Sequence, residues 1–314
     1  MKKPMAMALL AAGTLLPVCT AVAQSENGVP TQAIVTIMGK DKEVPPSVRQ
    51  EDIRVQVNGK QSDITDWTPL KGDRAGLELV ILIDGSARTS LGRTLDDIKH
   101  FVQSLPPTTK VGIAYMEYGR AAFTAPLTAD HAQALKGLRL PSGNPGSNAS
   151  PYFCLSDLAK HWPSKDQDVR REVVMITDGV DRYNLRFDPS NPYVQSAIKD
   201  SLRAGLVVHS IYWLDQGFVD RSMYQTNAGQ SLLSIVTQAT GGYSYWQGTG
   251  NPVSLQPFLE DLGRRLENQY ELGFIAHSKG KPEIANLKIK VNVPGAKVDS
   301  PGQVSVAPGG AALN

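Results

Sequence analysis

The sequence predicts an α/β fold: a doubly wound, mostly parallel sheet with a small accessory β unit built from the N- and C-terminal flanks. Three observations predict it. Four apolar runs between residues 77 and 212 are rich in branched residues, as in strands buried on both faces of a parallel sheet. Segments with helical spacing separate these runs, which favours right-handed crossovers. On either side of this core the pattern changes to that of half-buried strands.

Residues 1–23 have the pattern of a signal peptide. Lys2 and Lys3 precede an apolar stretch, Met5 to Val18, and Ala21-Val22-Ala23 has the small residues of a cleavage site. The apolar stretch is short and interrupted, which argues against a membrane anchor. Cys19 would suit a lipoprotein, but the valine before it is a poor match for lipidation. We therefore expect a chain exported to the periplasm or the extracellular space that does not span the membrane after cleavage.

After cleavage the chain is formally neutral. The 32 Lys and Arg residues become 30 without Lys2 and Lys3, and all 30 Asp and Glu residues lie beyond Ala23. Nucleic-acid binding needs a concentrated basic surface, so we do not expect it. Cys154 is then the single cysteine, which leaves no internal disulfide in an oxidising compartment. The remaining length of about 290 residues suits one large domain with a small extra module.

The first flank, residues 24–76, is predicted to be rich in β-strands. Ile34–Ile37 and Ile53–Val57 carry β-branched residues, and Asn58-Gly59 is typical of a tight turn. A β unit this thin is not stable without a neighbour.

The core, residues 77–268, is predicted to alternate strands with helices. The expected strands are Leu77–Ile83, Val111–Met116, Glu172–Thr177, Leu206–Tyr212 and Tyr243–Trp246. The expected helices are Thr94–Leu105, His131–Leu138, Cys154–Trp162, Tyr193–Ala204, Ser231–Thr240 and Ser254–Asn268.

The second flank, residues 269–300, is again strand-like at Tyr270–Ala276 and Leu287–Val293. Residues 301–314 are rich in Gly and Pro, which predicts a flexible tail. Since neither flank can bury a face alone, we expect the two flanks to meet in space.

Polar residues follow the ends of the predicted central strands. Asp84 and Ser86 come after the first strand, and Asp178 comes after the third. Ligands of open α/β sheets bind outside the carboxyl ends of the strands, so these side chains are expected at one edge. Asp and Ser residues spaced by two can offer oxygen ligands to a hard cation such as Mg²⁺. The next position in this spacing is Arg88, which has no oxygen to offer.

At these positions the core resembles a von Willebrand factor type A (VWA) domain. In that family Asp-x-Ser-x-Ser, a loop Thr and a later Asp form the metal ion-dependent adhesion site. This site binds Mg²⁺ or a similar ion, and a carboxylate of the partner protein completes the octahedron. The resemblance implies that Asp84, Ser86 and Asp178 occupy ligand positions. It places Ser150 at the loop position, for which Ser147 competes.

The flanks extend this resemblance over most of the mature chain. Asp52–Gln61 is similar to the lead-in of a family of exported, VWA-related bacterial proteins first catalogued in acidobacteria. Tyr270–Phe274 and Leu287–Gly295 are similar to the closing strands of that family. The resemblance implies protein–protein interaction or adhesion through loops at the ends of the strands.

Arg88 departs from the family pattern. It removes an oxygen ligand and places a permanent positive charge near the cation position. Like charges ~4 Å apart repel by about 4 kcal/mol at an effective dielectric of 20. Because Mg²⁺ demands near-ideal octahedral geometry, we expect a metal-free or very weak site. The side chain of Arg88 has two possible placements. It could pair with Asp84 or Asp178 and hold the loops without metal, or it could point outward and leave room for a water in place of the missing hydroxyl.

We therefore expect a non-enzymatic binding protein that recognises another protein at this edge of the sheet. Arg88 biases the surface toward an acidic partner group. The long loop after the third strand carries Tyr183, Asn184 and Arg186, and it is the expected recognition segment.

Two other functions remain open at this point. In a structural or assembly component of an envelope complex, the core is a scaffold and the β ends make the contacts. A hydrolase would use Ser86 or Cys154, but the chain has no Gly-x-Ser-x-Gly elbow and no histidine in the loops at that edge.

Overall fold

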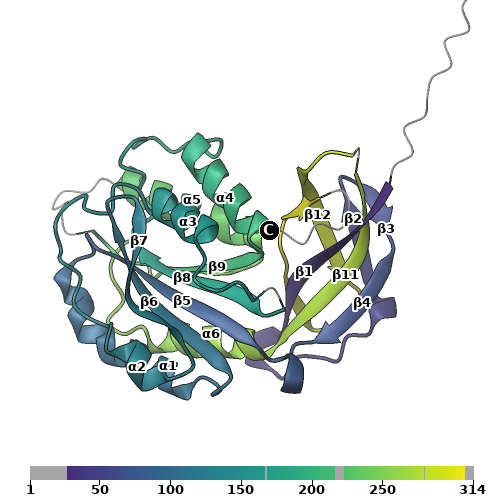
Figure 1. Ribbon diagram of the computed structural model, residues 1–314, viewed down its shortest axis with the longest axis horizontal. Helices are drawn as coiled ribbons and strands as arrows, with labels where there is room; N and C mark the ends of the chain where they lie inside the picture. Colours follow the sequence, from purple (N-terminus) through teal and green to yellow (C-terminus); the bar gives the residue numbers. More distant parts are fainter. Residues whose placement is uncertain (1–26, 167, 216–222, 279, 308–314) are drawn as a thin grey trace, which may run out of the picture.

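Two units, an α/β unit and an antiparallel β unit, lie side by side in the computed structural model of the protein (Figure 1). The structure describes residues 27–166, 168–215, 223–278 and 280–307. The predicted signal peptide, residues 1–23, lies outside these residues. Within the described ranges, no helix combines the length and the apolar character needed to cross a membrane.

A six-stranded sheet forms the centre of the α/β unit. Every residue of the strand Leu77–Asp84 is buried, as expected for a strand covered on both faces. This strand pairs in parallel with both of its neighbours, and only the last strand of one edge runs antiparallel. In spatial order the strands are β10 (Ser244–Tyr245), β9 (Leu206–Tyr212), β8 (Arg170–Thr177), β5 (Leu77–Asp84), β6 (Thr109–Glu117) and β7 (Arg120–Thr128).

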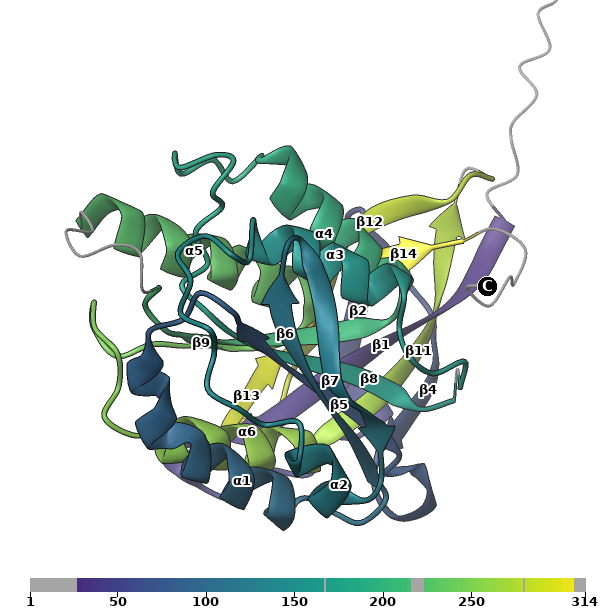
Figure 2. The same cartoon turned by 60° about the vertical axis from the view of Figure 1, so that its left-hand side comes forward.

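Helices cover both faces of this sheet (Figure 2). Leu79 and Ile81 of β5 point to one helical layer, whereas Val80 and Leu82 point to the other, because successive side chains of a strand alternate. The first layer contains α1 (Leu95–Ser104), α2 (His131–Leu135) and α6 (Gln256–Glu267). The second contains α3 (Pro151–Lys160), α4 (Pro192–Arg203) and α5 (Met223–Thr240). Short 3-10 helices are η1 (Lys40–Lys42), η2 (Gln50–Asp52), η3 (Gly72–Arg74) and η4 (Thr89–Thr94).

The β unit consists of two four-stranded antiparallel sheets around a core of its own. One sheet has the order β13 (Ala296–Asp299), β1 (Asn27–Gly39), β11 (Gln269–Ser278), β4 (Ile64–Pro69). The other has the order β14 (Gln303–Val306), β12 (Glu283–Val291), β2 (Ile53–Val57), β3 (Lys60–Ser62). The long pairing of β1 with β11 brings the two flanks of the chain together, so each supplies the neighbour that the other needs.

Polar contacts join the two units. Arg170 of β8 donates from Nη1 to Gln269 Oε1 at 2.7 Å, and Arg265 of α6 forms an ion pair with Asp299 of β13. The backbone N–H of Gly302 donates to the carbonyl oxygen of Gln238 at 2.9 Å.

The predicted fold class is confirmed, including the accessory β unit formed by both flanks. The structure has strands that the sequence analysis did not name, namely β3, β4, β7, β13 and β14. β7 was not predicted, because its mixed burial gives no clean alternation and Pro126 interrupts it. β14 lies inside the predicted flexible tail of residues 301–314. It is ordered because Val304 and Val306 alternate toward the core of the β unit and pair with β12. Residues 308–314 of that tail lie outside the described residues.

Candidate functional site at the carboxyl edge of the sheet

Three segments meet at the carboxyl edge of the central sheet. Asp84 ends β5, Thr177 ends β8, and Asn148 comes from the loop between α2 and α3. Residue 85 is a glycine packed between β6 and this loop: a Cβ there would lie 2.7 Å from the carbonyl oxygen of Met116 and 3.3 Å from Ser147 Oγ. The chain thus gathers polar side chains from distant parts of the sequence where α/β sheets bind their ligands.

The carboxylate of Asp84 is the centre of this cluster, and it is only 1% exposed. Its Oδ1 accepts hydrogen bonds from the backbone N–H of Ser86 at 2.9 Å and from Ser86 Oγ at 2.6 Å. Its Oδ2 accepts from Asn148 Nδ2 at 2.8 Å and from Thr177 Oγ1 at 2.6 Å. Because a carboxylate has about four acceptor positions, these donors saturate it.

Burial raises the pKa of Asp84 to about 6, and the nearby charge of Asp178 adds to the rise. The hydrogen bonds from Ser86 and Thr177 act in the opposite direction, because they stabilise the charged form. At pH 7 the group is therefore mostly ionised.

The second carboxylate of the cluster, Asp178, is held by an arginine. Its Oδ1 accepts from the backbone N–H of Val180 at 2.7 Å, and its Oδ2 lies 3.1 Å from Arg182 Nη2. The same Nη2 atom lies 2.7 Å from Oδ2 of Asp215, which follows β9. Both carboxylates are buried, so the guanidinium joins the ends of two strands through buried charge pairs.

The predicted loop ligand Ser150 has a structural contact of its own. Its Oγ accepts from the backbone N–H of Tyr152 at 3.3 Å and caps the first turn of α3. Asn148, two residues earlier, is the loop residue whose side chain reaches Asp84. Ser147 Oγ and Asn148 Oδ1 are buried oxygens without a hydrogen bond to the described residues.

Arg88 connects the segment after β5 to the segment after β9. Its backbone N–H donates to Leu214 O at 2.9 Å, and its Nε donates to the carbonyl oxygen of Asp215 at 3.1 Å. Trp213 Nε1 donates to Arg88 O at 3.3 Å. Arg88 is thus bound to the neighbouring loop, and among the described residues Arg182 contacts Asp178.

The carboxylates at this edge are engaged by donors from the protein itself. Both oxygens of Asp84 already accept two hydrogen bonds each, and Ser86 Oγ is one of the donors. Asp178 is engaged with Arg182. In the parts of the chain that the structure describes, no group of three or more His, Cys, Asp or Glu side chains is placed to hold a metal ion.

The long loop after β8 is fixed by its own hydrogen bonds. Buried Asp181 accepts from the backbone N–H of Tyr183 at 3.0 Å and from Asn191 Nδ2 at 2.9 Å. The Oδ1 of Asn184 accepts from the backbone N–H of Arg186 at 3.3 Å. Of the predicted recognition residues, Asn184 therefore orders the loop, while Tyr183 and Arg186 are exposed on it.

Aromatic rings from three segments contact one another beside this loop. Phe153, in the first turn of α3, lies 5.1 Å from Tyr183 and 4.7 Å from Tyr193 between ring centroids. Tyr183 lies 6.2 Å from Tyr193 and remains 64% exposed. The loop thus presents an exposed ring whose position is fixed by its neighbours.

Both candidate nucleophiles, Ser86 and Cys154, are buried. Ser86 Oγ donates to Asp84 without an imidazole between them. Cys154 is buried, and burial raises the pKa of its thiol well above the usual range, with a further rise from the charge of Asp84. Its Sγ donates to Asn148 O at 3.4 Å. Within the described residues, no histidine hydrogen-bonds to either side chain.

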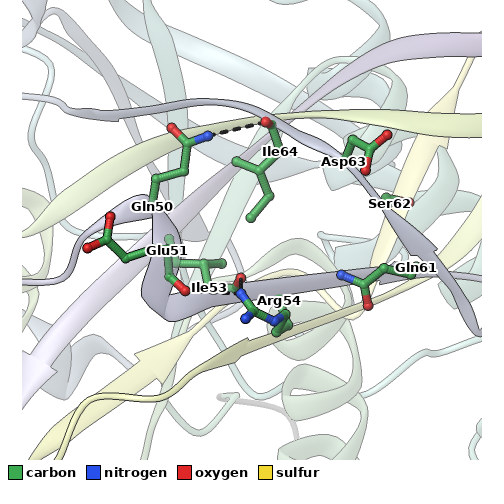
Figure 3. A pocket seen from close by; sticks show the side chains of 8 residues that line it. All are labelled: Gln50, Glu51, Ile53, Arg54, Gln61, Ser62, Asp63 and Ile64. Atoms are coloured by element: carbon green, nitrogen blue, oxygen red, sulfur yellow. Dashed lines mark hydrogen bonds between the residues drawn. The ribbon is translucent and has the colours of Figure 1, made fainter.

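A separate hollow lies in the β unit (Figure 3). It is open to solvent, has a volume of about 510 Å³, and is lined by polar side chains such as Gln50 and Gln61. Gln50 Nε2 donates across it to Ile64 O at 3.2 Å. The hollow involves η2, β2, β3 and β4, and it takes no part in the Asp84 cluster.

Four residues of the cluster were not assigned from the sequence: Asn148, Thr177, Arg182 and Asp215. Thr177 directly precedes Asp178 at the end of a buried strand, so its position could have indicated that it belongs to the same cluster. Arg182 follows Asp178 by four residues, but only the path of the loop brings the two together. Nothing in the sequence around Asp215 indicates its contact with Arg182.

No protein-family model and no curated protein matches the sequence. Several solved structures are similar to it. An aerotolerance-related membrane protein from Bacteroides fragilis is 17% identical over 61% of this chain and 98% of its own, with a TM-score of 0.44. BatB from Bacteroides thetaiotaomicron is 17% identical over 61% of this chain and 97% of its own, with a TM-score of 0.43. The SpRpn10 VWA domain is 14% identical over 57% of this chain and 96% of its own, with a TM-score of 0.37.

Proposed function

We propose that the chain is an exported, VWA-like, non-enzymatic binding protein that recognises a protein partner through the loops at the carboxyl edge of its sheet. Its adhesion site is degenerate and works without a metal ion. The observation that carries this proposal is the buried guanidinium of Arg182, which contacts both Asp178 and Asp215. It supplies positive charge between strand ends where the sequence pattern suggested a cation.

The arrangement supports binding because the loops are ordered before a partner arrives. Asp84 holds the segments of Ser86, Asn148 and Thr177 together through its four hydrogen bonds. A preorganised surface loses less conformational entropy on association. Exposed aromatic and arginine side chains are the residues that most often dominate binding energy, and the adjoining loop presents Tyr183 and Arg186.

Site-specific photo-cross-linking in the native cells tests this function. A photoreactive phenylalanine analogue replaces Tyr183 in one variant and Lys288, on an exposed position of β12, in another. We expect a discrete cross-linked protein from the Tyr183 position that persists when EDTA is added. Cross-links only from Lys288 would favour the alternative of an assembly component that uses its β unit. Loss of the Tyr183 product in EDTA would contradict metal independence.

Export has a direct test of its own. The proposal expects mature protein that begins after Ala23 in the periplasmic or extracellular fraction. N-terminal mass spectrometry of the fractionated protein measures this. An intact N-terminus in the cytoplasmic fraction would contradict it.

A further inference from the structure

An aromatic patch lies beside the Asp84 cluster. The rings of Phe153 in α3, Tyr183 in the loop after β8 and Tyr193 in α4 contact one another, and the turn between β6 and β7 that carries the exposed Tyr118 borders them. Phe153 contacts both Tyr183 and Tyr193, and it also packs against Gly119, where a Cβ would lie 3.5 Å from that of Phe153. Separate segments of the chain therefore converge on one half-buried ring.

The turn that carries Tyr118 is held in a conformation that a tyrosine rarely adopts. Its φ of 52° lies in the left-handed region, which is unfavourable for a bulky residue. Hydrogen bonds fix the turn on the neighbouring loop, from Tyr118 N to Ser147 O at 2.6 Å and from Gly119 N to Asn148 O at 3.1 Å. Yet the side chain is 82% exposed, so packing inside the protein does not explain the tyrosine. The two-residue hairpin turn between Glu117 and Arg120 requires a positive φ at both of its central residues, so the turn explains the backbone conformation but not the choice of an exposed ring.

Two arginines flank the patch. Arg120 follows the Tyr118 turn, and Arg186 lies three residues after Tyr183; both are exposed. Within the described residues, neither guanidinium has an ion pair or a hydrogen bond.

Within the described residues, no carboxylate forms an ion pair with Arg120 or Arg186, and Glu117, opposite Arg120 in the hairpin, pairs with Arg139 at 3.0 Å. Asp157 accepts from the backbone N–H of Ala121 at 3.0 Å, and Asp188 accepts from that of Ser190 at 2.8 Å. Asp181 is buried among its own loop contacts. The rim of the patch therefore carries positive charge that the adjacent acidic side chains do not pair with.

From this combination we infer that the aromatic patch binds an acidic, linear peptide segment that carries a large apolar side chain. The apolar side chain packs on the rings of Tyr118, Phe153 and Tyr183, and the segment's carboxylates form bidentate pairs with Arg120 and Arg186. This inference rests on the proposed function and names its class of partner. Single-stranded nucleic acid also stacks on aromatic rings, but it needs a long basic groove, and the mature chain is formally neutral.

Fluorescence anisotropy with synthetic peptides tests the inference on the mature protein. The probe is a short labelled peptide with glutamates on both sides of one tryptophan. The comparison probes replace the glutamates with glutamines or the tryptophan with alanine, and an oligothymidine replaces the peptide. We expect saturable binding of the acidic tryptophan peptide, weakened about tenfold or more by either replacement.

Protein variants locate the binding. Tyr118→Asn removes the ring while keeping a residue that tolerates the left-handed region, and Tyr183→Ala removes the second ring. Arg120→Glu with Arg186→Glu reverses the charge of the rim. Each change is expected to weaken binding about tenfold or more, while Trp246→Ala and Lys288→Glu, at exposed positions away from the patch, leave it unchanged. Thermal melts confirm that all variants are folded.

Three results would overturn the inference: no saturable binding of the acidic peptide, equal binding of the glutamine peptide, or tighter binding of the oligothymidine. These failures are distinguishable from failure of the proposed function. If cross-links form at Tyr183 while the peptides do not bind, the carboxyl edge still binds a protein, and only the acidic linear partner is wrong.

Discussion

Arg182 lies four residues after Asp178, and its Nη2 atom contacts the carboxylates of Asp178 at 3.1 Å and Asp215 at 2.7 Å. This arginine places positive charge beside two buried carboxylates. Because the contact links the ends of β8 and β9, it stabilises the edge of the sheet without a bound ion. Arg88 reinforces the same junction through the carbonyl oxygen of Asp215.

Replacing Arg182 with methionine tests this role. The change removes one guanidinium from two buried ion pairs, and we expect it to lower the free energy of unfolding by about 3–5 kcal/mol. Urea denaturation measures the loss. The exposed Arg186→Met in the same loop is the matched control and should change stability by less than about 0.5 kcal/mol. Equal effects of the two substitutions would contradict the role of Arg182.

Asn148 is predicted to stabilise the cluster through the hydrogen bond that its side chain donates to Asp84. Asn148→Ala removes one donor from a buried carboxylate, and we expect a loss of about 1–3 kcal/mol in the free energy of unfolding. Asn144→Ala, at an exposed position of the same loop, is the control. If both variants unfold at the same urea concentration as the wild type, the hydrogen bond to Asp84 does not contribute.

Asp84 predicts a specific pH dependence of stability. Its pKa is raised to about 6 in the folded protein, from 3.8 for the ordinary group, so the folded state binds more protons between these values. Stability from this group is therefore greatest below pH 3.8, falls as pH rises toward 6, and is constant above that. The contribution of Asp84 to the free energy of unfolding falls by a total on the order of 3 kcal/mol over this range.

Urea denaturation of the wild type and Asp84→Asn across this pH range measures that contribution. The asparagine side chain of the variant cannot ionise, so the difference between the two proteins should change by this amount between about pH 4 and about pH 6. A pH-independent difference would show that Asp84 does not titrate in this window.

The thiol of Cys154 is predicted to be inert in the folded protein. Burial keeps it protonated and inaccessible, and the thiolate is the reactive form. A thiol reagent such as iodoacetamide should label it at pH 7 only after denaturation, as measured by intact-mass spectrometry. Rapid stoichiometric labelling of the native chain would instead support the hydrolase hypothesis.

The sequence predicted the central sheet well because composition alone identifies a strand buried on both faces. The run Leu77–Ile83 is apolar except for Glu78, and the structure buries all of β5. The flanking strands were also recognisable from their β-branched residues. β14 was missed because Gly and Pro dominate its surroundings, while Val304 and Val306 alone provide its buried side.

The candidate site was predictable only in part. Asp84, Ser86 and Asp178 follow central strands, so topology places them at one edge. Asn148 was not predictable, because its contact with Asp84 spans 64 residues and depends on the path of a loop. The position of Arg182 similarly depends on the turn at Gly179, which has a φ of 67° and leaves no room for a Cβ beside the carbonyl oxygen of Gly229.

Metal independence is the central claim of this account, and calorimetric titration of Mg²⁺ and Mn²⁺ into the mature protein tests it most directly. We expect no saturable heat of binding, because Asp84 is saturated by hydrogen bonds and Asp178 is paired with Arg182. Saturable binding to the wild type that disappears in Asp84→Ala would contradict the account, since it would show that a cation displaces these internal contacts.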